Sequence, residues 1–160
     1  MHSKYSLPRN STEGFASRVR KNLAFIIDHR DNGADVHEVT QLAISLLGLV
    51  VFPWEAGALH HLEDLTLTEL QSEGWPQWDI TLDEKADTKT LGALVKHIRN
   101  AASHRRLRFS SDSPIMAEVQ IEFEDAYPQS GKVHWRASIN AAHLKDFCDR
   151  FTTRLEDLVG

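Results

Sequence analysis

Six consecutive residues combine side chains that can act on a phosphodiester without a metal ion. Positions 99–104 read Arg-Asn-Ala-Ala-Ser-His. An arginine guanidinium can donate two parallel hydrogen bonds to a phosphate, and a histidine imidazole can take up or release a proton near neutral pH. Arg99 and His104, with the polar Asn100 and Ser103 between them, are therefore the first residues to examine for chemistry.

A helix is predicted to present these side chains. Over residues 88–106, apolar residues recur at three- and four-residue spacing, which is typical of a helix with one buried face. The buried face consists of Leu91, Leu94, Val95, Ile98 and Ala102. At about 100° per residue, Asn100 and Ser103 lie almost opposite this face. Arg99 and His104 flank them, so we expect all four side chains on one exposed wall.

The same helix is one-sided in charge. Residues 88–111 contain six lysines and arginines and no acidic residue, although the whole chain has a formal net charge of −5. The C-terminal end of a helix dipole would favour Arg105 and Arg106 but would not explain Lys96 or the absence of acids. We therefore favour a phosphate-binding patch, which we call the basic wall. Its members are Lys96, Ser103, Arg105, Arg106 and Arg108.

Three residues near this wall each have two interpretations. Glu55 either forms an ion pair with Arg99 or is a carboxylate at the rim. His97 lies one heptad before His104 and is either a second ring at the site or a packing residue. Gly92 either permits another helix to approach closely or is simply tolerated within the helix.

No metal site and no cofactor are predicted. His60 and His61 stand near Glu63 and Asp64, but adjacent histidines on a helix do not face each other. The sequence contains neither HExxH nor CxxC spacing. Cys148 falls on the apolar face of the last predicted helix, so we interpret it as a core residue rather than a nucleophile.

The pattern as a whole predicts a mainly α protein: a helical bundle with a β-hairpin inserted before the C-terminal helix. Helices are expected over 12–30, over 35–53 with Asp35 as cap and Pro53 as stop, within 59–70, over 88–106 with Asp87 or Thr88 as cap, and after Asn140. Alternating residues over 119–124 and 133–139 predict the two strands of the hairpin. The 160 residues suit a single domain, with residues 1–10 as a loose N-terminal arm.

The sequence also favours a reducing compartment. Cys148 is the only cysteine, so no disulfide can form within the chain, and no long apolar segment stands at the start. The longest apolar run, residues 42–53, is too short to span a bilayer and predicts a buried core helix. We therefore expect a cytoplasmic protein without membrane association.

The motif Arg99-Asn100-x-x-x-His104, near the end of an amphipathic helix, resembles the signature of the HEPN superfamily (higher eukaryotes and prokaryotes nucleotide-binding domain). That signature is an arginine, a polar residue, variable residues and a histidine. The long apolar helix ending at residues 51–55 and the basic motif helix make the chain similar to a small plasmid- or phage-associated HEPN branch. The resemblance covers most of the chain.

The resemblance implies a metal-independent endoribonuclease. It would work as a homodimer whose two motif helices line a shared cleft, and it would leave a 2′,3′-cyclic phosphate by attack of the 2′-OH. Arg99 and His104 would be catalytic, and Asn100 would orient them or the phosphate. The patch would bind RNA, and a cognate antitoxin would be a further partner if the protein is a toxin rather than an antiviral defence enzyme.

Other HEPN proteins are catalytically silent, and a nucleotide- or RNA-binding or regulatory module is therefore the alternative function. The complete set of Arg99, Asn100 and His104 argues against this alternative, because a silent module does not need all three.

Overall fold

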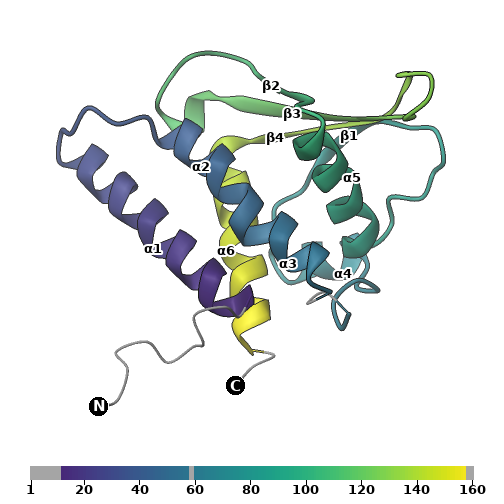
Figure 1. Cartoon of the computed structure of the whole chain (residues 1–160), viewed down its shortest axis with the longest axis horizontal. Coiled ribbons are helices and arrows are strands. Elements are labelled where there is room, and N and C mark those ends of the chain that lie inside the picture. Colours follow the sequence, from purple (N-terminus) through teal and green to yellow (C-terminus); the bar gives the residue numbers. More distant parts are fainter. Residues whose placement is uncertain (1–11, 58–59, 158–160) are drawn as a thin grey trace.

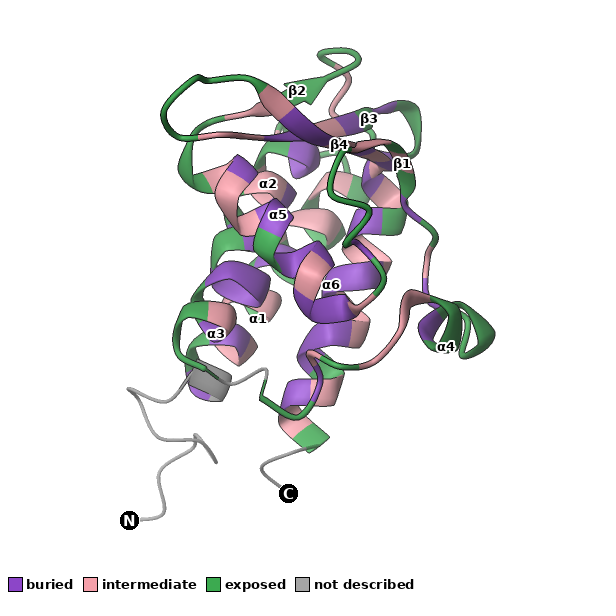
Figure 2. Ribbon diagram, turned by 90° about the vertical axis from the view of Figure 1, so that its right-hand side faces the viewer, coloured by how far each residue is buried: buried purple, intermediate pink, exposed green. Residues whose placement is uncertain are grey.

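The computed structural model describes residues 12–57 and 60–157, in which helices and a sheet form two layers (Figure 1). The strands lie across one end of the helices, and the start of α1 and the end of α6 lie at the opposite end (Figures 1 and 2). The elements are α1 (Thr12–Asp31), α2 (Glu38–Leu46), the π-helical segment η1 (Leu47–Val51), α3 (Phe52–Glu55), α4 (Leu67–Ser72), β1 (Asp79–Asp83), α5 (Leu91–Ser103), β2 (Leu107–Phe109), the 3-10 turn η2 (Met116–Glu118), β3 (Gln120–Ala126), β4 (Val133–Asn140) and α6 (Ala141–Asp157). The predicted N-terminal arm lies outside the described residues.

The sheet is larger than the sequence predicts. The expected hairpin is present as β3 and β4, but β1 pairs antiparallel with β4, and β2 with β3, which gives the order β1-β4-β3-β2. The expectation of a mainly α fold is corrected accordingly: the fold is mixed α/β. The two added strands have five and three residues, too few for alternation to distinguish them from loops.

The second helix begins later than predicted. Its N-cap is His37, whose ring Nδ1 accepts a hydrogen bond from the Thr40 amide at 3.2 Å, and the predicted cap Asp35 lies outside the helix. An imidazole nitrogen can thus replace the usual hydroxyl or carboxylate oxygen of a cap.

The same helix also ends later than predicted, because it continues past Pro53 to Glu55. The π segment directly precedes this point, and there the Phe52 amide donates to the Leu47 carbonyl, five residues back. Pro53 stands in the first turn of α3, where a missing N–H is tolerated. The widened turn therefore lets the helix carry Glu55 beyond the proline.

By length and composition, this stretch could cross a membrane. Glu38–Glu55 is 18 residues long with a mean hydropathy of 1.2, and 56% of it is buried within the fold. The core helix of a soluble protein meets the same criteria. The burial agrees with the predicted core helix.

One hydrophobic core joins the two layers. Phe123 and Trp135 of the sheet and Phe147 of α6 are almost fully buried. Trp75 and Trp78, which precede β1, are also buried and meet the Phe147 ring edge-on at 5.6 and 5.4 Å. Figure 2 shows buried residues on α5, on α6 and on the strands of the sheet.

Helix α5, which carries the motif, is shorter than predicted at both ends. Its N-cap is Thr90, whose hydroxyl accepts from the Ala93 amide at 3.2 Å, and neither Asp87 nor Thr88 serves this role. At its other end the helix stops at Ser103, which leaves His104 at the cap.

A left-handed residue ends α5. Arg105 has a φ of 56°, and its amide donates to Ala102 at 3.3 Å while the Arg106 amide donates to Ala101 at 2.8 Å. These two bonds form a Schellman motif, in which glycine usually takes the left-handed position. An arginine there is strained, and the chain then enters β2 directly.

Replacing Arg105 by glycine should therefore stabilise the protein by about 1 kcal/mol, because it relieves the left-handed strain. Ala86→Gly, at the other left-handed non-glycine position (φ 49°) of the described chain, should do the same. Lys96→Gly, within α5, should instead cost about 1 kcal/mol. Urea unfolding measures all three, and a loss of stability in Arg105→Gly would contradict the strain.

Candidate functional site

Arg99 is half-buried on α5 and held by two contacts. Its Nη1 donates to the Asn100 side-chain oxygen at 2.7 Å, and its Nε lies 2.5 Å from a carboxylate oxygen of Glu55 on α3. The second contact is an ion pair rather than a hydrogen bond, since the Nε–H is not aligned on an acceptor. Of the two interpretations of Glu55, the ion pair with Arg99 is the one present.

Asn100 connects Arg99 to the interior. Its amide nitrogen donates to Oδ2 of Asp125 at 2.9 Å, while its oxygen accepts from Arg99. Asp125 lies on β3 and is 4% exposed. The amide can therefore stand in one orientation only, because a flip would turn its NH₂ toward the guanidinium and its oxygen toward the carboxylate.

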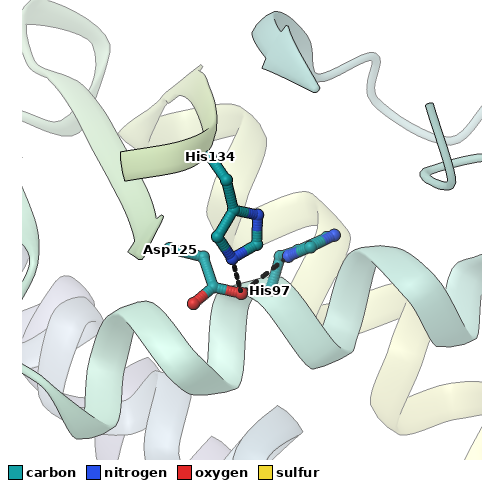
Figure 3. Close-up of side chains that lie close together, drawn as sticks. All are labelled: His97, Asp125 and His134. Carbon is teal, nitrogen blue, oxygen red and sulfur yellow. Dashed lines mark hydrogen bonds and ion pairs between the residues drawn. The ribbon is translucent and has the colours of Figure 1, made fainter. Parts of the chain in front are cut away.

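Asp125 is the centre of a buried cluster with His97 and His134 (Figure 3). Its Oδ2 lies 2.8 Å from His97 Nδ1 and 3.7 Å from His134 Nε2. The other nitrogen of His97 lies 3.2 Å from a carboxylate oxygen of Asp87. The His97 ring also stacks on Trp135, with centroids 4.6 Å apart. His97 is thus a packed and fully bonded residue, and it does not share the exposed wall with His104.

A β-bulge places His134 in this cluster. Asp125 pairs with Trp135, and Ala126 pairs with Val133, so His134 is an extra residue on β4. Strict alternation would put His134 and Trp135 on opposite faces of the sheet. A bulge can re-aim a side chain, and here both residues are buried.

His104 is separate from this network. Its side chain is exposed, and it makes no hydrogen bond or ion pair with the described part of the chain. Its backbone amide bonds to Asn100 and Ala102 within the cap. It lies five positions after Arg99, so at about 100° per residue the two side chains point about 140° apart around the helix axis. The structure therefore brings together Arg99, Asn100 and Glu55 but does not bring His104 to them.

The residues of the predicted phosphate-binding patch come from three consecutive segments: Lys96 and Ser103 from α5, Arg105 and Arg106 from the turn after it, and Arg108 from β2. Lys96, Ser103, Arg105 and Arg108 are exposed, and Arg106 is half-buried. Arg108 lies 3.7 Å from Glu124 of β3. Acids of other elements thus balance part of the wall, namely Glu55 at Arg99 and Glu124 at Arg108. Within residues 12–57 and 60–157, the remaining basic members of the wall form no ion pair.

The buried cluster is also the group of described residues whose donors could hold a metal ion. Two imidazole nitrogens and one carboxylate oxygen within 4.8 Å are a donor set that zinc accepts. Ligands bound tetrahedrally at 2.0–2.2 Å would lie about 3.4 Å apart. The 2.8 Å between His97 and Asp125 is instead a hydrogen-bond length. The cluster is therefore built as a hydrogen-bonded network that would have to open for a metal.

Two other sequence interpretations are resolved by packing. A Cβ on Gly92 would lie 2.7 Å from the Glu63 side chain and 2.9 Å from its carbonyl oxygen, so this glycine admits a segment of its own chain rather than another helix. Cys148 is fully buried, and burial raises the pKa of its thiol far above the usual range. It is therefore a core residue.

The motif, the basic wall and the helix-plus-hairpin pattern all invite comparison with known families. The family described as HEPN pEK499 p136 matches residues 2–159. The chain belongs to this HEPN family. This membership confirms the predicted resemblance to the HEPN superfamily, whose members include ribonucleases and nucleotide-binding modules. No curated protein and no solved structure matches the chain.

Sequence reasoning missed the buried part of this candidate site. Asp125 has the same parity as Ile121 and Phe123, so alternation alone places a carboxylate on the buried face of β3. That pattern marks a polar group in need of partners. His134 carried no such signal, because the bulge that turns it inward depends on strand register.

The contact between His97 and Asp87 predicts a pH-dependent stability. Partial burial opposes ionisation of Asp87, but the hydrogen bond and charge of His97, together with Lys85, outweigh it and lower the pKa of Asp87 below 3.8. A lowered folded-state pKa contributes stability above the unfolded value, and this contribution is lost as the pH falls through the folded value.

Asp87→Asn should therefore lower the urea midpoint at pH 7, and its difference from the wild type should shrink as the pH falls below 3.8. Asp79→Asn, at an exposed position of β1, is the matched control and should show little difference at either pH. A constant difference between wild type and Asp87→Asn from about pH 7 to about pH 2 would contradict the assigned pairing.

Proposed function

We propose that this HEPN protein is a metal-independent endoribonuclease. The observation that carries the proposal is the state of the three motif residues. Arg99 and Asn100 are held by directed contacts, while His104 is left exposed at the end of the basic wall. A fixed cation and an accessible imidazole are what phosphate binding and proton transfer respectively need.

In the proposed reaction, the ribose 2′-oxygen attacks the adjacent phosphorus and the bond to the 5′-oxygen breaks, which leaves a 2′,3′-cyclic phosphate and a free 5′-OH. One imidazole takes the 2′-OH proton and another group returns a proton to the 5′-oxygen. His104 fits either role. The Arg99 guanidinium stabilises the charge on the phosphorus oxygens, since it has donors beyond those facing Glu55 and Asn100. Lys96, Ser103, Arg105, Arg106 and Arg108 bind the neighbouring phosphates.

A second copy of the chain completes this site in our proposal. Arg99 and His104 leave α5 in different directions, so one chain does not place both on one phosphate, whereas a twofold interface brings two motif helices together. An exposed apolar stripe of Phe15, Ile44, Leu47 and Phe52 supports this arrangement. The Phe15 and Phe52 rings are in contact, and Phe52 lies one turn before Glu55, the partner of Arg99. The stripe, rather than Gly92, is the surface for the second copy.

One observation favours the alternative, a catalytically silent RNA- or nucleotide-binding module. Arg99 already has a carboxylate partner in Glu55, which offsets its charge in the free protein. A silent module would bind RNA through the basic wall without cleaving it.

The setting that we propose for the enzyme is cytoplasmic, as a toxin with a cognate antitoxin or as an antiviral defence ribonuclease.

The purified protein should cleave RNA in EDTA and leave cyclic phosphate ends. His104→Ala and Arg99→Ala should each reduce cleavage at least about 100-fold, because each removes transition-state stabilisation or proton transfer. His143→Ala removes an exposed histidine of α6, and Arg150→Ala breaks the ion pair with Asp146, so these controls should cleave like the wild type. Binding of RNA without cleavage by the wild type would favour the silent module, and cleavage only with added Mg²⁺ or Mn²⁺ would exclude the mechanism.

Substitutions in the apolar stripe test whether the protein forms the proposed dimer. Ile44→Glu and Leu47→Glu place a charge on exposed apolar positions and should shift the mass measured by light scattering from two chains to one. Cleavage should fall with association. Ile115→Glu alters an exposed apolar residue outside the stripe and should change neither mass nor cleavage. A wild-type monomer with full activity would contradict the composite site.

A further inference from the structure

The buried cluster reaches the motif through one amide group. Asp125 accepts from Asn100, Asn100 accepts from Arg99, and the Asn100 side chain makes no other hydrogen bond with the described residues. This path crosses from β3 to the surface of α5. Asp125 itself is buried away from solvent, so it is not a candidate for contact with RNA.

We propose that Asp125 is a positioning residue for the motif: it fixes the amide of Asn100 and, through that amide, the guanidinium of Arg99. The catalytic part of this inference rests on the proposed ribonuclease function. The positioning itself concerns the free protein and can be measured without RNA.

The orientation of the Asn100 amide depends on the charge of Asp125. With a carboxylate behind it, the amide must turn its NH₂ inward and its oxygen toward Arg99. Without that carboxylate, the reverse orientation is no longer opposed, and Arg99 would then face a donor instead of an acceptor. The negative charge of Asp125 thus decides whether Arg99 keeps its partner.

The other anchor of Arg99 cannot replace this one. Glu55 is a surface group, with its side chain 53% exposed, and its pairing with Arg99 is screened by water and salt. The bond between Asn100 and Asp125 is half-buried and charge-assisted, so solvent weakens it less. A competing phosphate can displace Glu55 while the Asn100 oxygen still holds Nη1.

Two histidines also face Asp125. His97 of α5 lies at 2.8 Å and His134 of β4 at 3.7 Å, and Asp87, from the loop before α5, lies at the far nitrogen of His97. The neighbours of Asp125 thus come from α5 and β4, and its contact with the motif is the hydrogen bond from the Asn100 amide. Asp125 therefore acts on Arg99 through Asn100 rather than through a direct ion pair.

The experiment compares Asp125→Ala, Asp125→Asn and the matched control Glu124→Ala. Glu124 is the neighbouring buried carboxylate on β3. It pairs with Arg136 at 2.9 Å and lies 3.7 Å from Arg108, and it has no hydrogen bond or ion pair with Arg99 or Asn100 among the described residues. The first readout is hydrogen exchange of the Asn100 side-chain amide, identified by the NMR signal that Asn100→Ala removes. Exchange should quicken at least about tenfold in Asp125→Ala, less in Asp125→Asn, and stay unchanged in Glu124→Ala.

The second readout is cleavage. Asp125→Ala should lower kcat about 10- to 100-fold with little change in KM, because a misplaced catalytic group costs rate more than binding. Asp125→Asn should recover part of the loss. In an Asn100→Ala background, Asp125→Ala should lower kcat no further, since both changes remove the same path. A structural role would give additive losses.

The positioning role of Asp125 and the ribonuclease function can each be refuted without refuting the other. An Asn100 amide that is equally protected in Asp125→Ala and the wild type overturns the positioning role, whatever the activity. Should Asp125→Ala not fold, unchanged amide exchange in Asp125→Asn overturns the positioning role instead. Additive kcat losses also overturn it. A wild type that cleaves no RNA, with amide exchange changed as expected, refutes the ribonuclease and leaves Asp125 as the residue that orients Arg99.

Discussion

The carboxylate of Asp125 lies in the interior, where an ionised group without partners would not be tolerated. Its partners come from α5 and β4, and those partners have partners of their own: Asp87 for His97 and Arg99 for Asn100. Glu55 of α3 closes the series at the surface. Removing one member of such a buried network leaves another charge uncompensated, at a typical cost of about 3–5 kcal/mol. The polar series therefore fixes how the helical layer sits on the sheet.

The motif helix is constrained at both ends by different means. Near its start, the Gly92 amide donates to the Glu63 carbonyl at 3.0 Å, so the helix lies against the preceding segment without room for a side chain. At its other end the left-handed Arg105 turns the chain into β2, whose pairing with β3 anchors the exit. Arg99 thus lies in the ordered body of the helix, and His104 lies at the turn. The two ends of the motif differ in rigidity: the arginine is held by the fold, and the histidine is free to adjust to a ligand.

The sequence predicted those parts of the fold that depend on local periodicity. The long helices, the β3–β4 hairpin and the motif on α5 follow from apolar spacing. The Asn100 side chain, predicted to lie on the exposed wall, is instead half-buried and donates to the buried Asp125. The edge strands were missed because their pairing is decided by β3 and β4 and not by their own few residues. His37 and Thr90 replace the predicted caps because the start of a helix depends on which side chain reaches the free amides. Helical spacing alone predicts that His97 lies near His104. In the structure His97 is buried against Asp125 and Asp87, which come from β3 and from the loop before α5.

The π segment before Pro53 sets more than the path of one helix. A π turn holds one residue more than an α turn, so the segment Leu47–Val51 changes the angular phase of everything that follows it on the helix. If the same residues were wound as a regular α-helix, α3 would be rotated by about 100° about the helix axis. Glu55 would then leave Arg99, although no residue of the motif had changed. The winding of a buried helix is therefore part of the specification of the surface site, because it decides whether Glu55 of α3 meets Arg99 of α5.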